Sequence, residues 1–292
     1  MHRLVSIIVL AAAAAWPAMS AAQAQPAPPR NPNILVDYIE PRPPIDPQDK
    51  DYAQDMADYQ RFMKIHQRVK QRQVLEELSA FLAPLKLPRP LRVRTKTCGM
   101  VNAFYSPDEY TVTICYEWID ATETMAAQPT EGFTRQEIIV GGFVGVVLHE
   151  LGHAVNDMLK LPVLGREEDA ADQIAGFLML QFGKDVARTA VKGMAYVWLT
   201  FSREGRAAYW DVHSTPGQRF YNFLCIGYGG DPDTFKDQVD KWLTKDRVAT
   251  CMHEYQQVRN AFAKTILPHI DQDLLKQVQA AKWLRPDDGK WD

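Results

Sequence analysis

The chain has 292 residues, 46% of them hydrophobic, and a formal net charge of −3, so it is long enough to bury a sizeable core. The near-neutral balance of 33 basic and 36 acidic residues leaves no electrostatic footprint for nucleic acid. Nucleic acid is therefore excluded from the expected partners.

Residues 1–24 have the pattern of an export signal. A short positive start precedes the apolar run Leu4–Ala15, and Ala22-Gln23-Ala24 has the small-residue pattern of a cleavage site. The run is shorter than the roughly 20 residues that a membrane span needs. We predict a signal peptide, a mature chain without an integral membrane segment, and export to the bacterial periplasm or the medium.

Residues 25–50 contain eight of the 19 prolines, which predicts an extended leader with at most a short strand at Ile34–Ile39. From Asp51 to Leu82, apolar residues recur every three or four positions, which predicts a helix. The expected organisation is a signal peptide (1–24), a proline-rich leader (25–50) and a single domain (51–292).

Alternating apolar residues predict three strands, at Leu91–Thr95, Val101–Tyr105 and Tyr110–Tyr116. A turn sequence separates the last two, so we expect a small antiparallel sheet.

The four cysteines all lie in the part of the chain that would be exported, where disulfides can form. Three pairings are possible, and the sequence-near ones, Cys98 with Cys115 and Cys225 with Cys251, are favoured. None of the cysteines has C-x-x-C spacing, so we expect no second metal site made of them.

A central helix is predicted to begin after Thr134, where Thr134 and Glu137 have the spacing of a capping box. Its run Ile138–Leu148 contains no polar residue, which indicates a buried core helix that ends by about Lys160. Further helices are expected at 167–182, 185–202, 216–226, 232–243, 247–266 and 268–283. The predicted fold class is α+β and mostly helical, with the small sheet packed on the central helix.

The central helix carries the sequence H-E-x-x-H at His149, Glu150 and His153. Residues four apart share one helix face, so both imidazoles can reach a single metal ion. Glu150 can face a water on that metal and take its proton, which is the arrangement of a zinc hydrolase. Such a string also arises by chance in roughly one chain in a hundred, so other residues must support it.

A catalytic zinc needs a third protein ligand and leaves a fourth position for water. Glu168 and Asp172 are spaced i, i+4 on a face of small residues, which favours close packing on the glycine-bearing central helix. Glu168 then serves as the third ligand, and Asp172 accepts the other ring N–H of a ligand histidine. Part of this acidic run is also explained as favourable charge at a helix start.

One further histidine, His213, lies in a polar loop two residues after Asp211. On position alone, a structural or surface role and a catalytic role fit His213 equally well.

The segment H-E-L-G-H, followed by an acidic segment of the E-x-x-A-x-D type, resembles the gluzincin peptidases, the thermolysin-like group. Val101-Asn102-Ala103-Phe104 is similar to the N-A-F strand ahead of the active-site helix in the HtpX and CAAX prenyl protease group. His213, with Arg219 six residues later, resembles that group's H-P-x-x-x-x-R motif, with Ser214 in place of the proline.

The segments at residues 161–172 and 218–222 are most similar to a bacterial family of exported metallopeptidase domains of unknown function. This resemblance covers most of the chain from about Ile34 and implies a zincin-like metallopeptidase fold. It implies no particular substrate.

These resemblances and the motif together imply one catalytic Zn²⁺ held by His149, His153 and Glu168, with Glu150 as the general base. His213 is expected to donate a hydrogen bond to the tetrahedral oxyanion.

Two further residues are expected to support His213: Asp211 by orienting it and Arg219 by holding its loop through carboxylates. An extended substrate peptide is expected to pair with the strand formed by Asn102, Ala103, Phe104 and Tyr105.

The expected function is therefore zinc-dependent hydrolysis of peptide bonds in a soluble or exposed protein. The alternative is a non-catalytic, zinc-stabilised module of the cell envelope that binds a peptide or protein. A purely structural zinc would not need Glu150 and would more often be fully coordinated by Cys and His.

Overall fold

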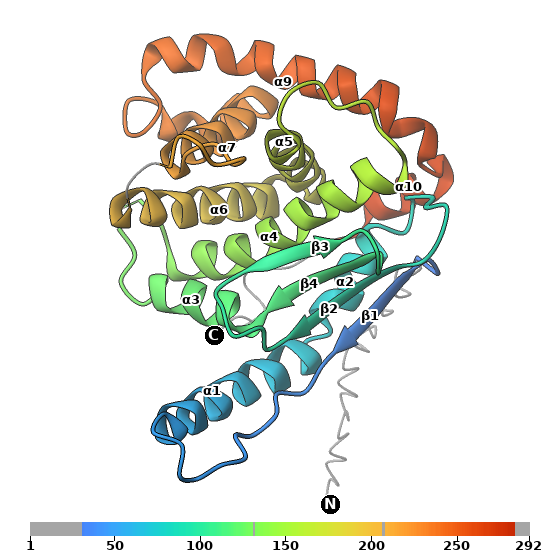
Figure 1. The fold of residues 1–292 in the computed structure, drawn as a ribbon. Coiled ribbons are helices and arrows are strands. Elements are labelled where there is room, and N and C mark those ends of the chain that lie inside the picture. The colour runs from blue at the N-terminus through green and yellow to red at the C-terminus, as the bar shows by residue number, and fades with distance from the viewer. Residues whose placement is uncertain (1–30, 131, 206–207, 284–292) are drawn as a thin grey trace, which may run out of the picture.

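The computed structural model describes residues 31–130, 132–205 and 208–283. The expected signal peptide (1–24) and the first part of the expected leader lie outside the described residues. Figure 1 shows a sheet flanked by helices, and most of the later helices of the chain lie on the side of strand β3.

The sheet has four strands in the order β1-β2-β4-β3. They are β1 (Ile34–Tyr38), β2 (Leu91–Lys96), β3 (Ala103–Ser106) and β4 (Thr111–Cys115). The strand expected within the leader is confirmed as β1.

The prediction of an antiparallel sheet is wrong, because β1 pairs parallel with β2 and β2 pairs parallel with β4. Only the β3–β4 hairpin is antiparallel. Residue alternation reveals strands but not their partners. β4 is buried at all five positions, as expected of an inner strand covered on both faces, and it displaces β3 to the edge of the sheet.

The helix expected over 51–82 is divided into α1 (Tyr52–Gln71) and α2 (Val74–Phe81). Gln73 between them has φ 53°, in the left-handed region, which no helix continues through. This short interruption lets α2 turn and pack against β1.

A third helix, α3 (Tyr116–Met125), was not predicted. It follows β4 directly and contacts α4. Its first residues continue the alternating apolar pattern of the strand, so the sequence did not indicate where the helix begins.

Most of the remaining helices lie where they were predicted. They are α4 (Arg135–Met158), α5 (Glu167–Met179), α6 (Lys184–Glu204), α7 (Pro216–Gly230), α9 (Lys245–Thr265) and α10 (Gln272–Ala280). The helix expected over 232–243 is wrong for most of its length, because α8 (Pro232–Phe235) gives way to a 3₁₀ turn, Lys236–Gln238.

The central helix α4 begins with the predicted capping box: the Thr134 hydroxyl accepts from the Glu137 N–H, and the Glu137 carboxylate accepts from the Thr134 N–H. It is the one helix among the described residues that is long and apolar enough to cross a membrane. Yet 94% of its most apolar window is buried in the fold, as in a globular core helix.

Glycines let α6 approach α4 closely. A Cβ built on Gly193 of α6 would lie 1.7 Å from the carbonyl oxygen of Glu137, and one on Gly141 would lie 2.5 Å from the Gly193 Cα. No larger residue fits there without moving one of the two helices. The helix that carries the H-E-x-x-H sequence is thereby held against a rigid neighbour.

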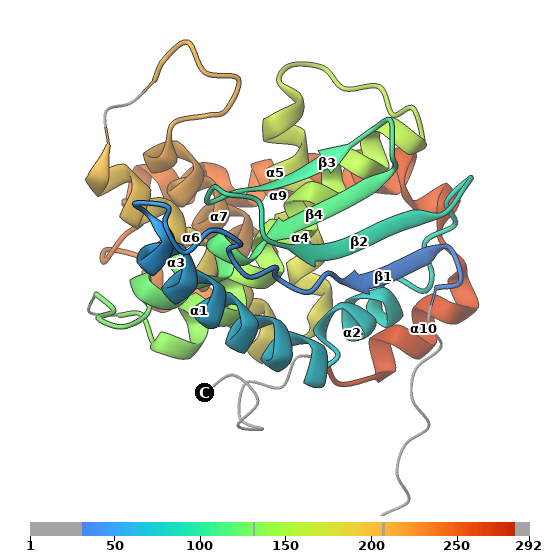
Figure 2. The same cartoon turned by 60° about the horizontal axis from the view of Figure 1, so that its bottom comes forward.

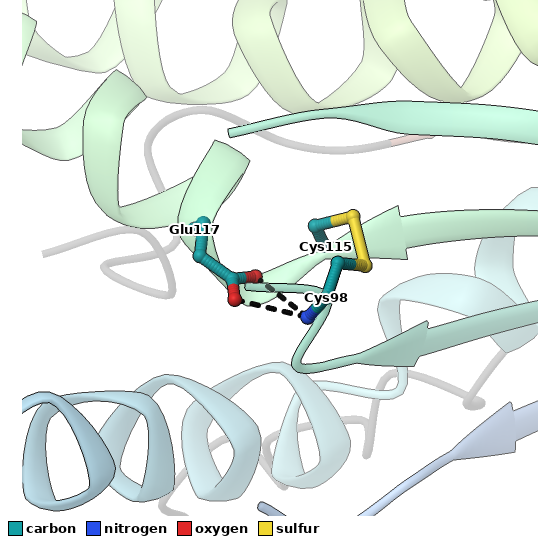
Figure 3. Close-up of side chains that lie close together, drawn as sticks. All are labelled: Cys98, Cys115 and Glu117. Atoms are coloured by element: carbon teal, nitrogen blue, oxygen red, sulfur yellow. Dashed lines mark hydrogen bonds between the residues drawn. A yellow bond between two sulfur atoms is a disulfide. The ribbon is translucent and has the colours of Figure 1, made fainter. Parts of the chain in front are cut away.

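Both predicted disulfides are present, Cys98–Cys115 and Cys225–Cys251. Figure 3 shows the first, beside Glu117, whose carboxylate accepts the backbone N–H of Cys98 at 2.9 Å and of Gly99 at 2.6 Å. The oxidised cysteines carry no thiolate, which is the form in which cysteine binds a metal. Two disulfides fit an oxidising compartment.

Candidate metal centre

The predicted ligands come together because α5 packs closely on α4. A Cβ on Gly152 of α4 would lie 2.8 Å from the Cα of Ala171 in α5, so only glycine permits this separation. The small-residue face inferred from the sequence is the contact itself. It brings the first turn of α5, with Glu168, over the face of α4 that carries His149 and His153.

Three side-chain atoms form a nearly equilateral triangle. His149 Nε2 lies 3.2 Å from His153 Nε2, and Glu168 Oε2 lies 3.2 Å from His149 Nε2 and 3.3 Å from His153 Nε2. Ligand bonds of about 2.0 Å in a tetrahedron place ligand atoms about 3.3 Å apart. The triangle therefore has the size of one face of a tetrahedral metal site.

The carboxylate oxygen at the third corner supports the same interpretation. Glu168 Oε2 is buried and has no hydrogen bond of acceptable geometry, although imidazole nitrogens surround it at hydrogen-bonding distance. A buried carboxylate oxygen without a partner is costly. Two ring nitrogens and a buried, unpartnered carboxylate oxygen held at these distances suit metal ligation, so the donor set fits a divalent metal.

Behind the triangle, Asp172 connects α4 to α7. Its Oδ1 lies 2.8 Å from His149 Nδ1, and its two oxygens accept from Arg219 Nε and Nη2, each at 2.6 Å. The Arg219 guanidinium is buried and stacks 3.5 Å from the ring centroid of Trp198. This chain of contacts fixes the ring of His149 and directs its Nε2 toward the triangle.

Glu150 lies between the metal face and the sheet. Its side chain is buried, and the backbone of Tyr105 in β3 lies close enough to its carboxylate to lower the pKa of Glu150 slightly against the effect of burial. The Tyr105 hydroxyl donates to Asp157 Oδ2 at 2.8 Å, which attaches β3 to α4. The edge strand therefore runs directly beside the proposed general base.

His213 reaches the same centre from the loop before α7. Its Nε2 lies 3.0 Å from Glu168 Oε2, and its Nδ1 lies 2.8 Å from Asp211 Oδ1. Ligand atoms of His149, Glu168 and His213 all lie within 4.8 Å of one another, so His213 is placed either beside a bound metal or as a further ligand. Figure 2 shows this loop and the loop before α5 both projecting on the side of β3.

A scan against protein-family models matches residues 54–266 to the DUF4344 family, described as "Putative metallopeptidase". The chain belongs to this family. No curated protein and no solved structure gives a significant match. Membership supports a protease-type enzyme that uses a metal ion, in agreement with the donor set above.

In this DUF4344 protein the surroundings of Glu168 and Asp172 favour the charged form of both carboxylates. Burial alone would raise the pKa of Glu168, but the three neighbouring imidazoles hold it well below its ordinary value. Burial would likewise raise the pKa of Asp172, and the charge of Arg219 with the hydrogen bond from His149 lowers it instead.

These carboxylates raise the pKa values of His149 and His153. Burial disfavours the charged form of His149, but its contacts with Asp172 and Glu168 outweigh burial and raise its pKa. Burial opposes the charged form of His153 as well, and Glu168 and Glu167 raise its pKa to about 9. Metals bind the neutral ring, so metal uptake displaces protons that the carboxylates otherwise favour.

The pKa of Glu150 is shifted in the opposite direction to that of Glu168. Burial raises its pKa, and the nearby His149 and His153 offset only part of that rise. A carboxylate with a raised pKa is a stronger base, closer to what proton transfer near neutral pH requires.

Some contacts of the site were not predicted from the sequence. Glu167 Oε1 lies 3.0 Å from His153 Nδ1, and Trp198 covers Arg219. The position of Glu167, next to the proposed ligand Glu168, was the only signal for it. The carboxylate that Arg219 binds is that of Asp172, in α5 beneath the metal face.

Proposed function

We propose that the protein is an exported, zinc-dependent endopeptidase, with the zincin-like arrangement of a gluzincin. The observation that carries the proposal is the triangle of His149 Nε2, His153 Nε2 and Glu168 Oε2, with an unpartnered buried oxygen at one corner. Two N ligands and one carboxylate are typical of catalytic zinc, whereas structural zinc is usually closed by four Cys or His residues. The two disulfides and the expected signal peptide support export.

His149, His153 and Glu168 would hold the ion, which when bound lowers the pKa of water and polarises a carbonyl. Glu150 takes a proton from the attacking water and later delivers it to the leaving amine. Its burial supports this role, because a carboxylate removed from solvent holds that proton closer to neutral pH.

His213 is proposed to donate a hydrogen bond to the oxyanion of the tetrahedral intermediate. Its Nδ1 contact with Asp211 orients the ring so that Nε2 faces the centre. The exposed loop position allows His213 to contact a substrate that covers the site.

An extended substrate is proposed to pair with the free edge of β3. β3 lies at the edge of the sheet, and the Tyr105 N–H beside Glu150 marks where the strand passes the catalytic base. Asn102 precedes the strand; its carbonyl accepts from the Cys115 N–H at 3.2 Å, which anchors the start of β3 to β4. Main-chain pairing would give affinity for an unfolded or exposed segment of protein.

The test compares the native protein with Glu150→Gln, using a denatured protein or a mixed peptide library as substrate and mass spectrometry to detect cleavage. The variant should retain about one bound zinc per chain and lose at least a thousandfold in turnover. Glu204→Gln, at the exposed end of α6, is the matched control and should cleave normally.

Two results would contradict the proposal. Cleavage that survives in Glu150→Gln would refute the assigned base. Zinc that binds tightly to the native protein without any cleavage, while peptides still bind, would support the non-catalytic binding module.

A further inference from the structure

Behind the metal helix lies an apolar cavity that the peptidase chemistry does not use. Its volume is about 220 Å³, and its lining includes the buried side chains of Phe81, Leu151, Val155 and Val278. Leu151 and Val155 each lie two residues after a proposed metal ligand of α4, and therefore on the opposite face of the helix. The cavity reaches the surface at the exposed residue Ala263 of α9.

A second cavity, of about 390 Å³, adjoins the first, and Ile174, Phe262 and Ile266 line both. Asn156 lines this second cavity; it is 7% exposed, and its Nδ2 has no hydrogen-bond partner. A buried amide donor left unpaired is costly, so its retention points to an acceptor that is not part of the chain's own described residues.

We propose that these two cavities bind one single-chain acyl compound, with the hydrocarbon tail in the first cavity and a neutral carbonyl or hydroxyl head at Asn156 in the second. The apolar walls suit the tail, because a dry cavity of about 150 Å³ lined by aliphatic and aromatic side chains already binds a six-carbon ring. The 220 Å³ cavity would accept a chain of roughly eight or nine carbons on that scale.

The charge around the head site decides between a neutral and an anionic head. Glu254 lines the second cavity, and Arg247 holds its pKa below the ordinary value, so it stays charged. Arg247 is already bound to that carboxylate at Nη2, 2.8 Å away, and does not itself line the cavity. A carboxylate head would face this charge, whereas an ester, an amide or an alcohol would accept from Asn156 without repulsion.

An anionic head group has a competing position at the rim of the first cavity. Arg259 lies on the rim of the first cavity, is exposed, and has no ion-pair partner among the described residues. A free fatty acid would place its carboxylate there and leave Asn156 unpaired. The preference between a neutral and an anionic ligand of equal chain length therefore distinguishes the two orientations.

The test uses titration calorimetry of the full mature protein with 1-octanoylglycerol below its micelle concentration, and with octanoate as the charged analogue. We expect saturable 1:1 binding of 1-octanoylglycerol and at least fivefold weaker binding of octanoate. Absence of saturable binding would overturn the proposal, and equal or tighter binding of octanoate would overturn the assigned head site.

Two variants locate the ligand. Asn156→Leu removes the unpaired donor at nearly constant size and should weaken 1-octanoylglycerol binding at least fivefold. Ala263→Trp fills the mouth of the tail cavity from an exposed position and should abolish binding, whereas Ala249→Trp, an exposed position of α9 that lines neither cavity, should not change it. Undiminished binding to both cavity variants would refute the location.

Discussion

Asp172 offers a test that separates what the site does for the fold from what it does for the metal. Replacing Asp172 with Asn keeps the size of the side chain but removes the charge between His149 and Arg219. Asp172 is 7% exposed and Arg219 is 4% exposed, so the guanidinium would remain buried without a counter-charge. Removing one partner of a buried pair costs about 3–5 kcal/mol of unfolding free energy.

The cost to stability is large enough to measure directly. For a domain of this size, each kcal/mol shifts the midpoint of thermal unfolding by about 2–4 °C, so Asp172→Asn should lower it by on the order of 10 °C. The same substitution loosens the ring of His149 and should weaken zinc binding by about 10–100-fold. Calorimetric unfolding of the metal-free protein and a competition titration with a zinc chelator measure the two effects separately.

Two further variants separate the loss of the Asp172 charge from a general disturbance of α5. Asp169→Asn, on the same helix but partly exposed and paired with Ser214, should change both quantities little. The double variant Asp172→Asn with Arg219→Leu removes the orphaned charge and should regain part of the lost stability without regaining zinc affinity. A single Asp172→Asn variant with native stability and native zinc affinity would show that the contacts among Asp172, His149 and Arg219 do not hold in solution.

Three other predictions follow from individual contacts. Gly193→Ala places a Cβ 1.7 Å from the Glu137 carbonyl and should destabilise the protein by about 3 kcal/mol or more in urea unfolding, while Gly205→Ala, whose Cβ would meet nothing nearer than 3.6 Å, should change it little. Replacing Cys225 and Cys251 together with Ser opens a link across 26 residues and should cost about 3.5 kcal/mol; an unchanged midpoint would show that the bond is not formed. His213→Ala should lower kcat by about 10²–10³ and leave the zinc content at one per chain; loss of zinc would make His213 a ligand.

The sequence alone predicted the proposed metal site, because that prediction depends on helical spacing. His149 and His153 must share a face of any helix that contains them, and the small residues of α5 indicated where that helix would pack. The capping box at Thr134 and the buried character of α4 were equally readable, since both depend on neighbours within a few residues.

Only the tertiary structure decided how distant segments pair. The order of the sheet, with β4 beside β2 and β3 at the edge, depends on which strand is buried on both faces. Alternation within a strand says nothing about that. The contact between Arg219 and Asp172, 47 residues apart, and the cover of Trp198 over Arg219 likewise arise only when α5, α6 and α7 meet.

The sequence by itself therefore determined that His149 and His153 share one helix face, and it predicted the metal centre proposed above, because residues four apart are placed by the local geometry of a helix. The tertiary structure decided the rest: Glu168 closes the triangle because Gly152 lets α5 approach α4, and β3 passes Glu150 because the sheet packs on α4. The tertiary structure likewise decided the cavity behind α4, since α2, the consecutive helices α4 and α5, and the consecutive helices α9 and α10 come from three distant parts of the chain and are brought together only by packing.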